Sequence, residues 1–93
     1  MAQTGSFTVD NVGGDDAITI PVPCRKLTIR EQGTPATTDY FVRAPYSNSA
    51  QFRKAAGEET VFEKHGVGLL QTGEIVGYLS TAVGSVTFNY ICE

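Results

Sequence analysis

Hydrophobic and polar residues alternate along much of this chain. Between residues 17 and 22, Ile18, Ile20 and Val22 fall on one side of an extended backbone and polar or small residues on the other. Because side chains point to opposite faces of a strand in turn, this alternation predicts a half-buried strand. The prolines at the end of the segment confine the strand to a sheet edge or a strand end.

Two further segments show the same period of two. Residues 24–31 place Leu27 and Ile29 on one face and mostly polar or charged side chains on the other, which predicts a strand with those two residues inward. Residues 39–46 carry bulky side chains on both faces. This pattern is typical of a strand with one face in a core and the other partly covered.

The rest of the chain consists of short apolar segments separated by turn residues. Residues 47–57 have two interpretations: one helical turn capped by a serine and ended by Gly57, or a short strand over 50–54. We favour the strand, because a single helical turn needs strong packing to be stable. A turn at 56–58 leads to a strand at 59–64 in which Val61 and Phe62 lie on opposite faces. Leu70 with its neighbour is predicted to plug the core or form a short strand.

The last two strands, at 74–80 and 84–92, are predicted to form a hairpin around 81–84. In total we expect six to eight short antiparallel strands about ten residues apart. The fold class is therefore all-β: a single-domain β-sandwich or small barrel of the jelly-roll or Ig-like kind. Nine valines, five isoleucines, eleven threonines, five phenylalanines and four tyrosines, against only four leucines, fit this class.

The first 16 residues begin with small and polar residues and end on a Gly-Gly-Asp-Asp turn. We expect residues 1–16 to be an N-terminal arm, with one short strand at 6–10, attached to a β-sandwich domain at 17–93. Such an arm is either frayed or ordered by a partner. Phe7 and Val9 are its candidate interface residues.

The chain carries a formal charge of −3, which gives no electrostatic case for binding nucleic acid or an anionic membrane. All seven basic residues lie before residue 65, and residues 65–93 contain only Glu74 and Glu93 as charges. This uncharged third either supplies central strands or faces another protein. Its polar side chains make it too hydrophilic for a membrane span, and the first residues lack a secretory signal, so we expect a soluble protein made without export.

Cys24 and Cys92 are the only cysteines. Counting alternate positions from the predicted strands puts Cys24 on a polar face and Cys92 on an apolar face. An inter-sheet disulfide requires both sulfurs inward, so we expect free thiols unless a bulge intervenes.

Residues that would support catalysis are scarce. His65 is the only histidine, and no serine or cysteine has the sequence context of a catalytic nucleophile. The cysteine and histidine spacing matches no zinc site, and Asp15-Asp16 lacks the calcium-loop pattern. We therefore expect no enzymatic activity, no catalytic residues, no metal and no cofactor.

The basic residues of the first two-thirds have two interpretations. Lys26 and Arg30 share a face of their strand, and Arg43 could lie on a neighbouring strand. These side chains either form a solvated outer face that discourages aggregation or dock an acidic protein surface. In the second case the aromatic anchors would be Tyr40, Tyr46 and Phe52. Carbohydrate binding would also use exposed tyrosine and aspartate, although the chain has no tryptophan.

Several segments resemble a known group of proteins. The order CRKLTIRE, a Thr/Pro loop, DYFVRAP, AAGEETVF and GYLSTAVGSVTFNYIC is similar to that of the small β-sandwich virion proteins of tailed bacteriophages, especially capsid decoration or cement proteins, over residues 17–93. The stretch 65–73 and the two cysteines have no place in that pattern.

The resemblance implies a structural role on the capsid surface of a virion, for a protein made in the host cytoplasm. The implied partner is the major capsid protein, whose subunits the protein would bridge, and the implied assembly is a homo-oligomer, a trimer in preference to a dimer. The alternative is a stand-alone binding module, such as a tail-fibre accessory or carbohydrate-recognising domain.

Overall fold

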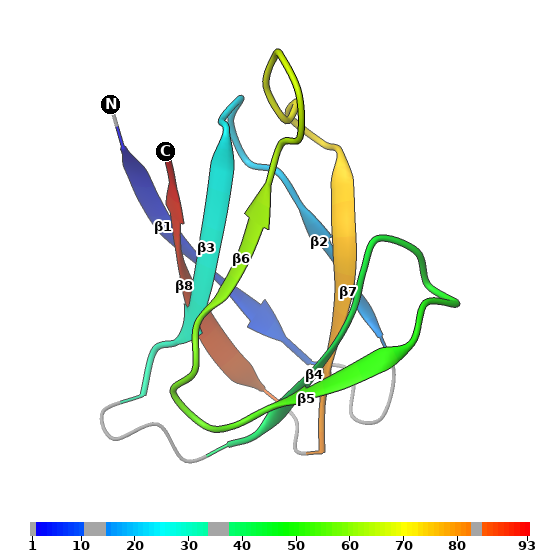
Figure 1. The fold of residues 1–93 in the computed structure, drawn as a ribbon. Helices are drawn as coiled ribbons and strands as arrows, with labels where there is room; N and C mark the ends of the chain where they lie inside the picture. Colours follow the sequence, from blue (N-terminus) through cyan, green and yellow to red (C-terminus); the bar gives the residue numbers. More distant parts are fainter. Residues whose placement is uncertain (1, 11–14, 34–37, 83–84) are drawn as a thin grey trace.

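Two four-stranded antiparallel sheets face each other in the computed structural model of the chain, which describes residues 2–10, 15–33, 38–82 and 85–93 (Figure 1). One sheet has the strand order β1-β8-β3-β6 and the other β2-β7-β4-β5. Within the described residues the strands are β1 (Gln3–Val9), β2 (Asp16–Thr19), β3 (Lys26–Glu31), β4 (Tyr40–Arg43), β5 (Gln51–Lys54), β6 (Thr60–Glu63), β7 (Ile75–Thr81) and β8 (Val86–Cys92).

The pairing of the strands follows a simple rule. β1 pairs with β8, β2 with β7, β3 with β6 and β4 with β5, as in a long hairpin that has been rolled up. The contacts of β3 with β8 and of β4 with β7 complete the two sheets. This is the arrangement of a jelly roll, so the predicted β-sandwich class is confirmed.

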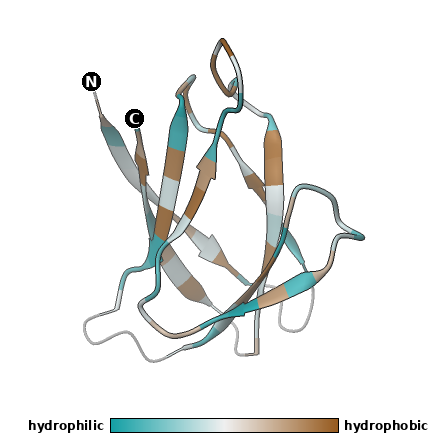
Figure 2. Ribbon diagram, viewed as in Figure 1, coloured by the Kyte–Doolittle hydropathy of each residue, from teal (hydrophilic) through white to brown (hydrophobic). Residues whose placement is uncertain are grey.

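The side chains that the alternation predicted to point inward form the core. Leu27 and Ile29 of β3 and Ile18 of β2 are buried, and Figure 2 shows the corresponding apolar bands along the strands. Phe88 of β8 joins the two layers, because its ring lies 5.1 Å from the Tyr40 ring of the opposite sheet in an edge-on geometry. Such aromatic contacts stabilise beyond the area that they bury.

The nearly uncharged final third supplies β7 and β8, and each of these strands is central in its sheet. Strands with neighbours on both sides and a packed inner face have little room for charge, which explains this composition. The predicted hairpin between them is wrong: β7 and β8 lie in different sheets and do not pair. Turn residues indicate that the chain reverses, but they do not specify which sheet the next strand enters.

Residues 3–9 differ from the arm expected for 1–16. β1 pairs with β8 along its whole length, from Gln3 opposite Cys92 to Val9 opposite Val86, and Val9 is fully buried. β1 is therefore an edge strand of the sandwich. Its pairing with β8 and the burial of Val9 order it, so that this order does not depend on another protein. Residues 11–14 of the expected arm lie outside the described residues.

Cys24 also differs from its expected position, because it is buried and not on a polar face. The backbone bends at Arg25, just before β3 begins, so the alternation counted from Leu27 does not continue back to Cys24. Both cysteines are unbridged, as expected, although the parity argument for this was wrong.

Residues 51–54 form a strand, as favoured over a helical turn, and the turn predicted at 56–58 is present. Glu58 N donates to Ala55 O over 3.0 Å, and Gly57 has a φ of 84°, which a glycine adopts without strain. Leu70 is buried as a plug between the sheets. Parts of the other predicted turns, at 13–14, 34–35 and 83–84, lie outside the described residues.

Candidate functional site

One side of the sandwich leaves a core-facing aromatic side chain uncovered. Phe52 of β5 lies opposite Val42 of β4 in the register, so both side chains project from the inner side of their sheet. Val42 is buried, whereas Phe52 is 65% exposed. The facing sheet ends at β6, and within the described residues it leaves Phe52 of β5 uncovered. β5 runs along the bottom of Figure 1 toward the lower right. We call this region the open edge and define it as Val42, Ala44, Phe52, Val61 and Phe62.

The open edge is hollow. A cavity of about 370 Å³ lies between β4–β5 and β6, with Val42 and Phe62 at its base and Phe52 and Val61 at its rim. A second hollow of about 520 Å³ shares Ala44 and Phe62 with the first and continues toward Ile75 of β7. Together they make a groove along one side of the molecule. Its lining is mainly apolar, but charged residues also border it: Arg53, Lys54, Glu58, Glu63, Lys64 and Glu74.

The strands beside this groove are both edge strands. β5 pairs only with β4, and β6 only with β3, so each has one side whose backbone N–H and C=O groups face no neighbouring strand among the described residues. Such an edge can hydrogen-bond an added strand. Val61 points away from the core on β6 and is exposed beside this edge.

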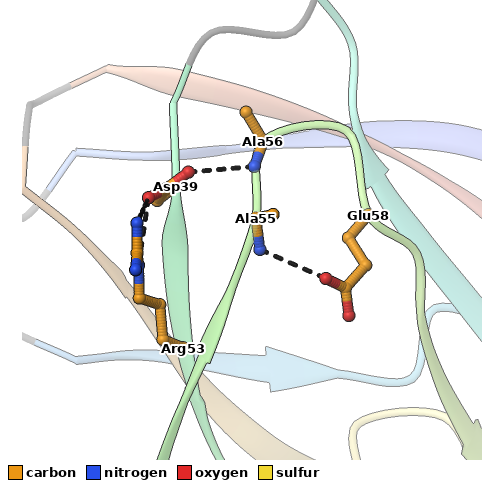
Figure 3. Close-up of polar contacts among 5 residues, drawn as sticks. All are labelled: Asp39, Arg53, Ala55, Ala56 and Glu58. Carbon is orange, nitrogen blue, oxygen red and sulfur yellow. Dashed lines mark hydrogen bonds and ion pairs between the residues drawn. The ribbon is translucent and has the colours of Figure 1, made fainter.

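The turn that joins β5 to β6 is held by a carboxylate at its base (Figure 3). Asp39 Oδ1 accepts a hydrogen bond of 3.0 Å from the Ala56 backbone N–H, and Asp39 Oδ2 accepts one of 3.0 Å from Arg53 Nε and forms an ion pair with Arg53 Nη2. The Arg53 guanidinium and the Ala56 N–H lower the pKa of Asp39, because both stabilise the carboxylate.

A second carboxylate closes the same turn from the other side. Glu58 Oε1 accepts a hydrogen bond of 3.2 Å from the Ala55 N–H (Figure 3). Glu58 Oε2 lies 3.1 Å from Lys54 Nζ. The ammonium group of Lys54 and the Ala55 N–H lower the pKa of Glu58. The buried Tyr40 hydroxyl donates to Glu58 O and lies 2.7 Å from Thr60 Oγ1, so the turn is also held from beneath.

Three of the candidate interface residues lie in or against the core. Val9 and Tyr40 are fully buried, and neither can contact another protein in this fold. Phe7 is half-buried and stacks on Phe88 at 5.6 Å. Sequence parity places Tyr40 and Val42 on the same face of their strand, but it does not show whether the other sheet covers that face.

The basic residues do not form a docking patch. Lys26 and Arg30 lie on β3 and Arg43 lies on β4, which belong to different sheets. Lys26 Nζ lies 3.7 Å from Glu93 Oε1, and Arg43 Nε lies 3.4 Å from Asp15 Oδ2. Arg30 is exposed and has no carboxylate partner within the described part of the chain. Because their charges are compensated locally, Lys26 and Arg43 offer little attraction to an acidic surface.

Arg25 holds the loop that follows β6 and is not part of a docking surface. Its Nη1 donates to Gly66 O over 2.8 Å and to Gly68 O over 2.7 Å, so the guanidinium clamps the loop after β6. Gly66 and Gly68 have φ values of 85° and 97°, which this tight loop requires. Val67 stands between them at the tip and is 94% exposed.

Tyr46 and Phe52 are the candidate anchors that the structure leaves accessible. Tyr46 is 69% exposed in the loop between β4 and β5. Its backbone exchanges hydrogen bonds of 3.1 Å with Ser49, and Arg43 Nη1 donates to Ser49 O over 2.8 Å, so the loop is ordered around it.

Val61 and Ile75 were missed as candidate site residues, although both are exposed beside the groove. The signal for Val61 was present in the sequence, because its parity is opposite to that of Phe62.

A separate hollow of about 320 Å³ lies on the opposite side of the sandwich, between the edge strands β1 and β2. Phe7 and Tyr90 supply aromatic walls, and Asp16 supplies a carboxyl group. An aromatic wall with a carboxylate is a general arrangement for binding a small polar ligand.

His65 is exposed on the loop after β6 and lines the groove, and it makes no hydrogen bond to another described residue. Within the described ranges, no group of three or more His, Cys, Asp or Glu side chains could hold a metal ion. None of the described segments is a helix long and apolar enough to cross a membrane.

Comparisons with known proteins found no matching family model, no similar curated protein and no similar solved structure.

Proposed function

We propose that this chain is a structural virion protein of a tailed bacteriophage, a capsid decoration (cement) protein that binds the outer shell and bridges major capsid subunits. The order of strands and turns over residues 17–93 supports the proposal through its resemblance to such proteins. The jelly roll adds a fold-level analogy, because capsid domains use this fold, although lectins use it too.

The open edge is the observation that carries the proposal. Phe52 projects from the inner side of its sheet with none of the described strands opposite it, and two strand edges that are unpaired among those strands border it. A segment of a capsid subunit that adds to β5 or β6 would gain backbone hydrogen bonds and bury Phe52 and Val61. Burying one such aromatic side chain contributes about 1.5–3 kcal/mol before the costs of association.

The rigidity of this edge supports binding by the same surface. The carboxylates of Asp39 and Glu58 fix the turn between β5 and β6, and the Tyr40 hydroxyl holds it from below. A preordered surface loses less conformational freedom on association. Many copies on a repeating lattice would add avidity, and a homotrimer would bring three such edges to one site between subunits.

Sedimentation with expanded capsids tests the proposal. The Phe52→Ser variant should bind capsids of the phage that carries the gene at least about tenfold more weakly, because it removes the exposed anchor. Its thermal stability should change little, since Phe52 is mostly exposed. Val67→Ser is the matched control: it also removes an exposed apolar side chain, but away from the open edge.

Two results would contradict the proposal: wild-type protein that separates cleanly from expanded capsids in a gradient, or a Phe52→Ser variant that binds as well as Val67→Ser. Light scattering coupled to size exclusion measures the proposed trimer independently.

The hollow between β1 and β2 favours the second candidate function, a carbohydrate-recognising module. Asp16 is the carboxylate there, and Tyr90 provides the accessible ring. If this function is correct, a monomeric sample gives a glycan-array signal that Asp16→Asn abolishes and Phe52→Ser leaves intact.

A further inference from the structure

Cys24 and Cys92 meet at one end of the sandwich. Cys92 is the last residue of β8 and lies opposite Leu27 of β3 and Gln3 of β1. Cys24 precedes β3 and forms an isolated bridge with Leu70, in which Cys24 N donates to Leu70 O over 3.1 Å and Leu70 N donates to Cys24 O over 2.8 Å. The pair therefore lies where the segment before β3 meets the end of β8.

The two thiols are buried as neighbours in the core. Both side chains are enclosed, and the Cys24 thiol is close enough to influence the Cys92 thiol. The backbone around them is fixed, because Arg25 N donates to Glu93 O over 3.0 Å and Glu93 N donates to Lys26 O over 2.9 Å. Neighbouring cysteines on a backbone that is fixed at both sides favour a disulfide, because the bond forms where two sulfurs can approach without backbone movement.

We propose that Cys24 and Cys92 are a disulfide-forming pair, with a low-molecular-weight disulfide such as oxidised glutathione as the oxidant. One cysteine, as its thiolate, attacks a sulfur of the oxidant and displaces a first glutathione thiolate. The other cysteine thiolate then attacks the mixed disulfide and displaces the second glutathione. Two protein thiols become one disulfide, one oxidised glutathione becomes two reduced glutathiones, and the two thiol protons pass to them.

Burial makes this reaction slow in the folded protein. Desolvation, reinforced by the neighbouring Cys24 thiol, raises the pKa of Cys92 to about 11, so that few molecules carry the nucleophilic thiolate at neutral pH. The oxidant also has no direct access to a buried sulfur. Oxidation should therefore accelerate with rising pH and with any opening of this end of the sandwich.

The bond would constrain most of the chain. A disulfide between residues 24 and 92 closes nearly three-quarters of the sequence into one loop, which restricts the unfolded state far more than the folded state. Since backbone hydrogen bonds already hold the two segments side by side, strain should cancel only part of this gain. The oxidised protein should melt about 10 °C or more above the reduced protein.

The experiment equilibrates the full chain with defined ratios of reduced and oxidised glutathione. We expect both thiols to disappear together, the intact mass to fall by two hydrogens, and the product to stay a single chain with a higher melting temperature. The two-thiol loss should be absent in Cys24→Ala, which can form only a mixed disulfide or a dimer through Cys92.

Three outcomes would overturn the proposal: thiols that persist where glutathione is largely oxidised, a mass gain of bound glutathione on the wild-type chain, or covalent dimers as the main product. If Cys24→Ala does not fold, the mass and thiol count of the wild-type protein decide the question alone. None of these results depends on capsid binding.

Discussion

Gly77 shows how closely single residues are fitted in this sandwich. It lies in the middle of β7, where a Cβ atom would stand 2.9 Å from the Arg43 carbonyl oxygen and 3.1 Å from Phe62 Cε1. The Arg43 oxygen belongs to the paired strand β4 and cannot withdraw without breaking the ladder. Gly5 of β1 is also crowded, but only by the ring of Tyr90, which is a half-buried side chain that can rotate.

These two glycines make a matched pair at the residue scale. Gly77→Ala should lower the free energy of unfolding by about 1–3 kcal/mol, the usual cost of overpacking. Gly5→Ala should change it by less than about 1 kcal/mol, because the ring can move and alanine restricts the unfolded chain. Urea denaturation of both variants measures the difference. Equal losses would mean that the β7–β4 backbone yields as easily as a side chain.

At the scale of elements, the turn between β5 and β6 makes stability depend on pH. The pKa of Asp39 is lowered from its ordinary value of 3.8, and that of Glu58 from 4.5, by their hydrogen-bonded partners. In the unfolded chain both carboxyls bind protons at a higher pH than in the folded chain. Their contribution to stability is therefore complete above about pH 5 and is lost as the pH falls through the lowered folded-state values.

Urea midpoints measured between pH 7 and pH 2 test this dependence. The Arg53→Gln variant keeps the Asp39 carboxyl but removes its cationic partner, so its stability should fall less steeply below pH 3.8 than that of the wild type. An unchanged slope would show that the ion pair at this turn does not contribute.

The strands themselves were predictable from the sequence, but their pairing was not. Alternation of period two identifies the inward faces of β2 and β3 because one face of each is buried. The same pattern does not show which sheet a strand joins. For this reason β7 and β8 were predicted to pair with each other, and β1 was assigned to an arm. Pairing in a rolled hairpin depends on contacts between residues far apart in sequence.

The candidate site was predictable only in part. Tyr46 and Phe52 were selected as exposed aromatic anchors and are exposed, whereas Val9 and Tyr40 are buried. Exposure of Phe52 depends on the facing sheet ending at β6, which no local pattern encodes. The bend at Arg25 likewise brings Cys24 into the core. Counting alternate faces back from Leu27 therefore gives the wrong face for Cys24.

At the scale of the whole molecule, the two sheets are joined by a small number of side chains that cross the interior. Tyr40 is one of them: its ring contacts Phe88 of the other sheet, and its hydroxyl reaches Glu58 O and Thr60 beyond the end of β5. Burial raises the pKa of Tyr40, which keeps the hydroxyl protonated and able to donate.

Tyr40→Phe separates packing from hydrogen bonding across the sandwich. The ring contact with Phe88 remains, but the Glu58 carbonyl and the Thr60 hydroxyl lose a buried partner. We expect the free energy of unfolding to fall by about 1–2 kcal/mol, measured by urea denaturation. This is a sizeable part of the 5–15 kcal/mol of a typical domain. A neutral result would mean that water replaces the hydroxyl.

The Arg25 clamp has a consequence for how this protein can diversify. The guanidinium binds the carbonyl oxygens of Gly66 and Gly68, and it touches no side chain of the residue between them. The shape of the loop is thus fixed by hydrogen bonds to its backbone. The exposed side chain of residue 67 takes no part in them, so the fold does not constrain which residue stands there. Substitution at position 67 should cost little stability, and a library randomised there should retain a folded scaffold in nearly every member.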